Sequence, residues 1–145
     1  MTEQLNRIEE LNREEIMDHY TNPRNFGELE DADIKYYDYN PVCGDEVKIQ
    51  VKLSIRNGAR LVESAKFKGR GCAISQAAAS MLTESIIGKE LIFLKSLGNE
   101  HMLQLLAINP DPVRIKCALL PLKALQKGVL IYEASDVAAK NGAKV

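Results

Sequence analysis

The sequence of 145 residues has no tryptophan, only three cysteines and no long apolar run. An odd number of widely spaced cysteines argues against the disulfide framework of a small secreted domain and favours reduced or metal-bound thiols. No apolar stretch is long enough to span a bilayer, so no membrane partner is expected. The polar, acidic N-terminus also lacks the apolar core of a signal peptide. These absences predict a cytoplasmic protein.

The chain also lacks an excess of either charge, because 19 basic residues face 20 acidic ones and the formal net charge is -1. The basic residues are scattered, so no nucleic-acid partner is expected. A chain of this length can bury a core without disulfides. We therefore predict one domain over residues 1–145, with the N-terminal helix and the tail after Ser135 as its mobile ends.

An α+β fold is predicted from two different periodicities. Residues 47–55 alternate strictly between apolar and polar side chains, as in a half-buried antiparallel strand. Asn57-Gly58 favours a type I′ hairpin turn, so residues 60–68 should form the returning strand. The tyrosine-rich segment 35–39 suits a third strand.

Helical spacing predicts the remaining elements. The expected helices are 5–20, ending before Asn22-Pro23; 74–86, with Gly88 as C-terminal cap; 91–97; a short helix capped by Asn99 and reaching Ala107; and one from Ala118 with Pro121 in its first turn. His19 and His101 are expected on the surface of their helices.

The three cysteines each lie beside a turn signal or a predicted element boundary. Cys43 precedes Gly44, Cys72 follows Gly71, and Cys117 follows a proline-rich loop. Asp45 adds a carboxylate two residues from the first thiol. Three soft thiolates and one oxygen ligand would make a four-coordinate site for zinc or an iron–sulfur cluster.

Local geometry supports such a site. Cys43 and Asp45 point to the same side if their segment is extended, so the thiol and the carboxylate can converge. Cys72 at a helix start, and Cys117 between Lys116 and a helix start, lie where a thiolate is stabilised. No Cys-x-x-Cys pair is present, and a free cysteine is most often a small buried apolar residue. The residues alone therefore leave open a metal-free interaction domain with buried thiols.

The sequence around the cysteines resembles the IscU/NifU-type iron–sulfur cluster assembly scaffolds, which include the SufU proteins. The resemblance runs from about Ile16 to Leu130 and rests on four stretches, Asp18–Gly27, Asn40–Asp45, Gly71–Ser75 and Pro112–Cys117. It implies a small antiparallel three-stranded sheet packed against helices, with the three cysteines meeting at one exposed tip.

The resemblance also implies a function. Cys43, Asp45, Cys72 and Cys117 would hold a transient [2Fe–2S] cluster, or zinc in its absence. The protein would be a scaffold and not a conventional enzyme: a cysteine desulfurase supplies the sulfur, and apo iron–sulfur proteins receive the finished cluster. The alternative is a SufU-like zinc-dependent sulfurtransferase, in which Cys117 accepts persulfide sulfur from the desulfurase.

At three places the sequence differs from one or the other of the two branches of this family, IscU and SufU. Lys116 is SufU-like, since the IscU branch has a histidine before its last cysteine. The segment from Gly88 to Pro112 is IscU-like, because it is too short for the SufU insertion. Residues 110–114 replace the Leu-Pro-Pro-Val-Lys motif by which the IscU branch binds an Hsp70-type chaperone. That chaperone is the partner for which the sequence gives the weakest support.

Overall fold

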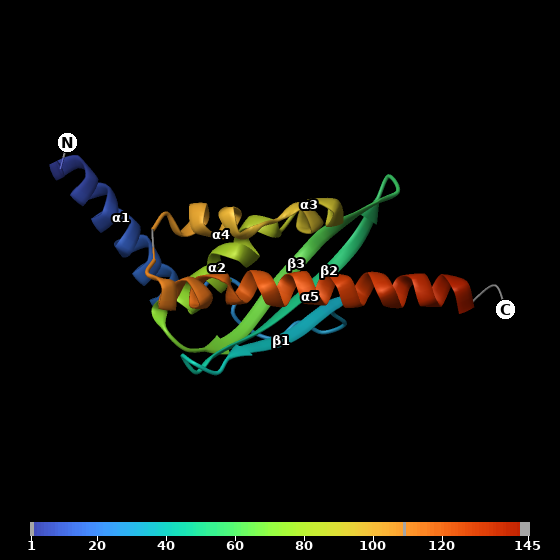
Figure 1. The fold of residues 1–145 in the computed structure, drawn as a ribbon. Coiled ribbons are helices and arrows are strands. Elements are labelled where there is room, and N and C mark those ends of the chain that lie inside the picture. Colours follow the sequence, from blue (N-terminus) through green and yellow to red (C-terminus); the bar gives the residue numbers. More distant parts are fainter. Residues whose placement is uncertain (1, 109, 143–145) are drawn as a thin grey trace.

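The computed structural model describes residues 2–108 and 110–142 (Figure 1). Its elements are α1 (Thr2–Thr21), β1 (Ile34–Asn40), β2 (Asp45–Arg56), β3 (Ala59–Arg70), α2 (Ala73–Ile86), α3 (Leu91–Ser96), α4 (Asn99–Leu106) and α5 (Pro112–Gly142). The predicted α+β class is confirmed. Within the described ranges, no helix combines the length and the apolar character needed to cross a membrane.

The three strands form one antiparallel sheet in the order β1–β2–β3. Asn57 and Gly58 connect β2 to β3 with φ angles of 51° and 81°, both positive as a type I′ turn requires. The predicted alternation places three residues of β2 in the core, namely Val47, Ile49 and Val51. The alternation fails at Ile55, which is 73% exposed, because the β2–β3 register shifts at Lys52/Leu53 before the strand reaches the turn.

The helices cover the apolar face of the sheet. α5 lies along β1 and β2, while α2 packs against β3 and α5 (Figure 1). α5 approaches β1 so closely that a methyl group on Gly128 would lie 2.9 Å from Cγ2 of Ile34. The predicted arrangement of a three-stranded sheet against helices is therefore confirmed.

The outer edge of β3 is covered at two places by segments without regular secondary structure. Near one end, the N–H of Gly27 donates to the carbonyl of Phe67 at 2.9 Å. Near the other end, the N–H of Val62 donates to the carbonyl of Lys89 at 2.8 Å. These bonds satisfy part of the backbone that an edge strand would leave unpaired.

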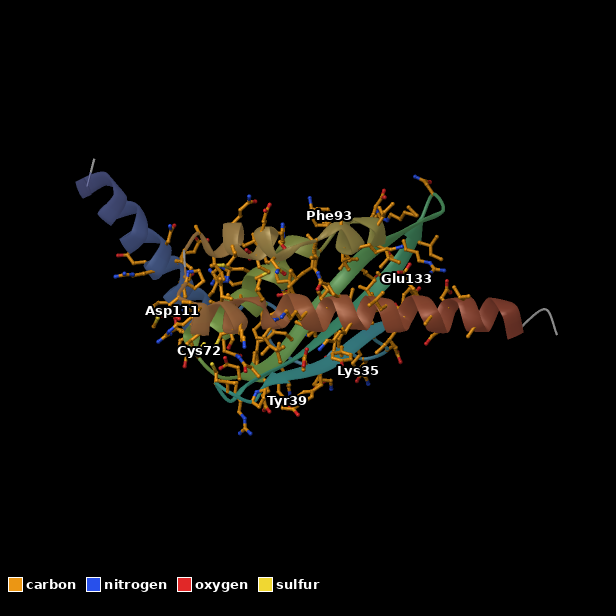
Figure 2. All side chains as sticks on the ribbon, viewed as in Figure 1. Lys35, Tyr39, Cys72, Phe93, Asp111 and Glu133 are labelled. Atoms are coloured by element: carbon orange, nitrogen blue, oxygen red, sulfur yellow. The ribbon has the colours of Figure 1, made fainter. Side chains whose placement is uncertain are left out.

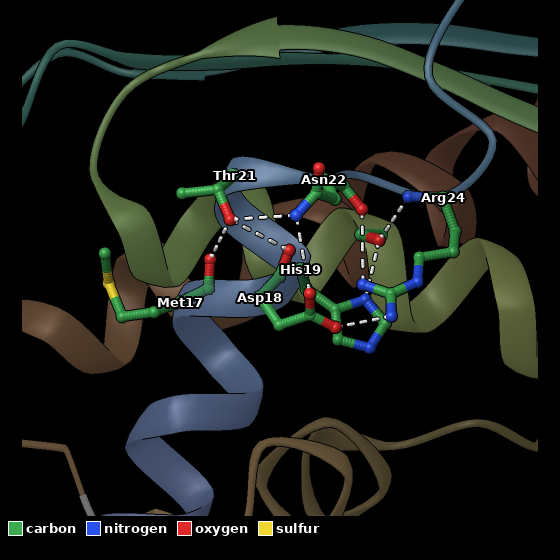
Figure 3. Close-up of polar contacts among 7 residues, drawn as sticks. Met17, Asp18, His19, Thr21, Asn22 and Arg24 are labelled. Atoms are coloured by element: carbon green, nitrogen blue, oxygen red, sulfur yellow. Dashed lines mark hydrogen bonds and ion pairs between the residues drawn. The ribbon is translucent and has the colours of Figure 1, made fainter.

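His19 is buried, and the prediction that it lies on the surface was wrong. Only 4% of the residue is exposed, and its Nδ1 lies 2.7 Å from the hydroxyl of Ser80 on α2 (Figure 3). The same hydroxyl accepts the N–H of Arg24 at 2.8 Å. The helix-end position of His19 suggested exposure, but α1 packs on α2 there and the ring fills that contact.

The last helix begins earlier than the sequence predicted. α5 starts at Pro112 because the carboxylate of Asp111 accepts the N–H groups of Val113 (3.1 Å) and Arg114 (2.9 Å), as an N-terminal cap does. Pro121 consequently lies inside the helix and not in its first turn. Because proline has no N–H, the carbonyl of Cys117 lacks its usual partner four residues later. The segment after Ser135, predicted to fray, continues the helix to Gly142.

Two details of the short helices also differ from prediction. Gly98, and not Asn99, is the N-cap of α4, and Asn99 is its first residue. His101 is only partly exposed, because its ring packs edge-on against Phe93 with centroids 6.0 Å apart.

Candidate metal-binding site

The hairpin between β1 and β2 positions the first two predicted ligands. Asn40 and Asp45 are opposite each other in the strand register and close a short loop that carries Cys43. Gly44 turns the chain with a φ of 73°, and its N–H donates to the carbonyl of Asn40 at 2.8 Å. Cys43 is exposed on this loop, whereas Asp45 is only 1% exposed.

Asp45 connects this hairpin to the start of α2. Its Oδ1 accepts the N–H of Cys72 at 2.7 Å, and its Oδ2 lies 3.7 Å from the sulfur of Cys72. Cys72 is the N-cap of α2, and its sulfur accepts the N–H of Ser75 at 3.5 Å. The predicted position of Cys72 at a helix start is therefore correct.

Gly71 is needed for this approach. Its φ is +147°, and a methyl group at this position would overlap Oδ1 of Asp45. Only glycine adopts this backbone conformation readily, and only glycine leaves room for the carboxylate. The connection from β3 to α2 can therefore pass directly beside Asp45.

Cys117 completes the cluster from the start of α5. One ligand atom from each of Cys43, Asp45 and Cys117 lies within 4.8 Å of the others. Cys72 is not part of this group of three, but its sulfur lies beside it, 3.7 Å from Oδ2 of Asp45. Figure 2 labels Cys72 near Asp111 at the end of the molecule where α5 begins.

The electrostatic environment of Cys117 differs from the prediction. Burial raises the pKa of its thiol, and hydrogen-bonding contacts with Asp45 and Cys43, together with the electrostatic effect of nearby Cys72 and Asp45, act in the same direction. The sequence predicted a stabilised thiolate because Cys117 was placed just before a helix. It lies inside α5 instead and is only 2% exposed. Without a bound cation, this environment keeps the thiol protonated.

A cavity of about 280 Å³ adjoins Cys43. We call it the Asn40 cavity; its lining residues are Asn40, Val42, Cys43, Pro112, Val113 and Lys116. The sequence reading did not assign a role to Asn40. Its place at the start of a turn was the available signal, since asparagine side chains commonly bond to the backbone two residues later.

Comparison with known proteins gives consistent matches along most of the chain. The family model for the NifU-like N terminal domain matches residues 11–139. The zinc-dependent sulfurtransferase SufU of Bacillus subtilis is 40% identical, covering 89% of this chain and 96% of its own length. The iron–sulfur cluster assembly scaffold protein IscU of Haemophilus influenzae is 34% identical, covering 85% and 96%.

Solved structures match as well. The crystal structure of a SufU protein from Fervidobacterium islandicum, described as an iron–sulfur cluster assembly scaffold protein for the SUF system, has a TM-score of 0.65 at 29% identity. It covers 80% of this chain and 94% of its own.

The two sequence matches differ in their gaps. The SufU alignment is 146 residues long although it covers only 89% of this 145-residue chain, so SufU has residues without a counterpart here. The IscU alignment, with 126 residues over 85% of the chain, leaves few such gaps.

Proposed function

This chain belongs to the family of NifU-like N-terminal domains, and we propose that it is a scaffold on which [2Fe–2S] clusters are assembled and from which they pass to apo-proteins. The observation that carries the proposal is the convergence of Cys43, Asp45 and Cys117, with the sulfur of Cys72 3.7 Å from Oδ2 of Asp45. Cys43, Asp45, Cys72 and Cys117 would be the ligands of this cargo. Thiolates are the usual protein ligands of such clusters.

The carboxylate of Asp45 suits a scaffold better than a permanent cluster protein. An oxygen ligand binds iron less tightly than a thiolate does, so one weak ligand favours release. One oxygen of Asp45 already accepts the N–H of Cys72, which orients the other toward the thiols. A site of this composition holds its cargo without retaining it permanently.

The partners follow from the same proposal. A cysteine desulfurase would supply sulfur, and apo iron–sulfur proteins would receive the cluster. Both exchanges need access to the cysteines, and Cys43 is exposed on its loop.

The second candidate is a zinc-dependent sulfurtransferase, as SufU is described to be. Two observations favour it: the 40% identity to SufU, and Lys116 beside Cys117. The donor set fits zinc, since three thiols and one carboxylate can form a tetrahedral site, and bound zinc would keep those thiols deprotonated. The gap pattern of the alignments favours the scaffold, because the chain lacks residues that SufU has.

The acceptor of sulfur in this second candidate needs reconsideration. The sequence assigned that role to Cys117, which is buried, whereas Cys43 is exposed. A partner's persulfide can reach Cys43 without any movement of α5. We therefore propose Cys43 as the better-placed acceptor.

The deciding experiment measures iron, zinc and acid-labile sulfide in protein purified without oxygen and incubated with iron, cysteine and a cysteine desulfurase. Iron and sulfide in equal amounts, with a visible charge-transfer spectrum that serine variants of the three cysteines lose, are the result expected of a scaffold. Retained zinc without sulfide, together with zinc-dependent stimulation of the desulfurase, would favour the sulfurtransferase. A protein that binds neither metal would refute both.

A further inference from the structure

The C-terminal half of α5 has an apolar surface on the side that faces away from the rest of the protein. Leu130, Ile131 and Val137 are 67%, 53% and 56% exposed. Ala134 and Ala138 are exposed as well. Single exposed apolar residues are common on soluble proteins, but these five lie close together on one helix and form a continuous surface. We call these five residues the α5 stripe.

The opposite side of the same helix holds α5 on the body of the protein. Leu125 and Val129 are buried there, and Gly128 lies against Ile34 of β1. At about 3.6 residues per turn, Ala134 in the middle of the stripe points about 180° away from these contacts. In Figure 1, α5 crosses one face of the molecule and its C-terminal part extends past β1. The helix is therefore apolar on two opposite sides, of which only one packs against its own chain.

The spacing within the stripe is typical of a contact between two helices. Leu130, Ala134 and Val137 follow one another at intervals of four and three residues, as the apolar positions of paired helices do. The small side chain of Ala134 allows another helix to approach closely, and larger side chains lie on both sides of it. The stripe thus fits an apolar helix of matching length.

A second copy of this chain supplies such a helix. If two α5 helices pair antiparallel around Ala134, Leu130 of one copy faces Ala138 of the other, and Ile131 faces Val137. Larger side chains then lie opposite smaller ones, which is how well-packed layers interdigitate. The same surface is used twice, so the assembly closes as a dimer. We propose that the protein forms a reversible homodimer in which the α5 stripes of two copies pair antiparallel.

The charges beside the stripe favour the antiparallel direction. Lys123 and Lys127 are exposed and precede the stripe on the same side of α5, and Lys123 has no ion pair within the described part of the chain. In a parallel pair each lysine would face its own copy, and like charges across an interface repel. In the antiparallel pair, Lys127 lies beside the last turn of the other α5, which ends at Gly142. The unpaired carbonyl groups and the negative end of the helix dipole at that turn attract a cation.

This dimer is independent of the proposed function and leaves both metal-binding sites free. Cys117 lies about 25 Å from Ala134 along α5 at a rise of about 1.5 Å per residue, so the sites of the two copies are about 50 Å apart along the paired helices. Five residues from each copy are fewer than the roughly 20–30 of a standard stable interface, so the dimer should dissociate on dilution.

The test measures the mass of the metal-free, full-length protein by sedimentation equilibrium. A reducing agent is present, so that neither a bridging metal nor a disulfide through the exposed Cys43 can join two copies. The wild type is expected to change from the mass of a monomer to that of a dimer between about 10 µM and 1 mM protein.

Two variants of equal charge test the surface. Ala134→Glu places like charges opposite each other in the middle of the pair and should weaken the dimer at least about tenfold. Ser135→Glu is the matched control, because it adds the same charge at the next exposed residue, outside the stripe, and should dimerise like the wild type. Circular dichroism of both variants checks that the helix is intact.

The direction of pairing is tested by mixing two further variants. Leu130→Glu and Ala138→Lys should each dimerise more weakly than the wild type, and their mixture should form a heterodimer, because only the antiparallel pair places residue 130 opposite residue 138. A mixture that stays monomeric would overturn the antiparallel pairing.

A wild type that stays monomeric over the whole concentration range would overturn the inference and leave the stripe to a different protein. Equal weakening by Ala134→Glu and Ser135→Glu would overturn it as well. Because the protein contains no metal in these measurements, the result does not depend on whether a cluster is assembled.

Discussion

Asp45 connects the β1–β2 hairpin to the start of α2. It belongs to β2, its Oδ1 accepts the N–H that begins α2, and its Oδ2 faces the thiol of Cys72. A substitution at this position can remove two different roles, that of a weak metal ligand and that of the acceptor for the N–H of Cys72. An experiment has to distinguish the two.

We predict that Asp45→Ala slows cluster transfer to an apo-ferredoxin, because the weak oxygen ligand that favours release is lost. Asp45→Asn is the matched variant, since its oxygen can still accept the N–H of Cys72. Transfer can be followed by circular dichroism in the visible range. If Asp45→Ala transfers its cluster as fast as the wild type, the role of the oxygen ligand is wrong.

We also predict that the three thiols of the metal-free protein react unequally with iodoacetamide at pH 8. Cys43 is exposed, whereas Cys117 is buried and its pKa is raised, so Cys43 should be alkylated at least about tenfold faster. Mass spectrometry of peptides gives the individual rates, and unfolded protein should show them converging. Slow reaction of all three would instead favour a metal-free domain with structural cysteines.

Residue chemistry explains which parts of the site the sequence could predict. Cys43 and Cys72 lie beside glycines whose turns are local, so their positions followed from neighbouring residues. The start of α5 depends on Asp111 acting as its N-cap. The prolines on either side of Asp111 suggested a loop there instead. The burial of Cys117 depends on packing between distant segments. No local pattern records it.

At the scale of the elements, α1 is attached to α2 through a buried polar contact. The hydroxyl of Ser80 accepts the N–H of Arg24 and lies 2.7 Å from Nδ1 of His19, to which it can donate its proton when the imidazole is neutral. Burial lowers the pKa of His19, and the nearby charge of Arg24 lowers it further.

We therefore predict that the protein loses stability as the pH falls below 6.5, the ordinary pKa of histidine. Between the pKa of His19 in the unfolded chain and its lower pKa in the folded protein, only the unfolded chain binds a proton at this residue. The slope from this residue is at most about 1.4 kcal/mol per pH unit. Urea unfolding of wild type and His19→Gln measures it; parallel curves for the two proteins between pH 7 and 5 would contradict the prediction.

The strands and helices themselves were easier to predict than their ends. Strict alternation in β2 and the Asn57-Gly58 turn are dictated by neighbouring residues, and both are present. Ile55 departs from its pattern because a register shift intervenes. His19 departs because the surface of α1 around it is covered by α2, a contact between residues 61 positions apart.

For the whole molecule, the site joins parts of the chain that are far apart in sequence. The β1–β2 hairpin, the start of α2 and the start of α5 each contribute a cysteine. A metal ion bound by all of them would cross-link the sheet to two helices, so its binding free energy would add to the free energy of unfolding.

We predict that zinc raises the melting temperature of the metal-free protein, with a stabilisation of about 2.7 kcal/mol when free zinc exceeds its Kd a hundredfold. Cys43→Ser should show a smaller increase, because one ligand is lost. Thermal unfolding with graded zinc, and then with excess chelator, provides the measurement. An unchanged melting temperature at all zinc concentrations would show that the four residues do not form a metal site in solution.

The proline inside α5 removes one backbone hydrogen bond beside the last cysteine. The carbonyl of Cys117 lacks its usual partner because Pro121, four residues later, has no N–H. On the C-terminal side of Pro121, an ion pair between Lys127 and Asp38, 2.9 Å apart, connects α5 to β1, and a second one between Arg60 and Asp136 connects it to β3. Among the described residues, the ion pairs of α5 therefore lie beyond Pro121, and the turn that carries Cys117 is held instead by the burial of Ala118, Leu119 and Leu120 in the core. The position of Cys117 in the site thus depends on apolar packing and not on charge, so salt should leave it unchanged.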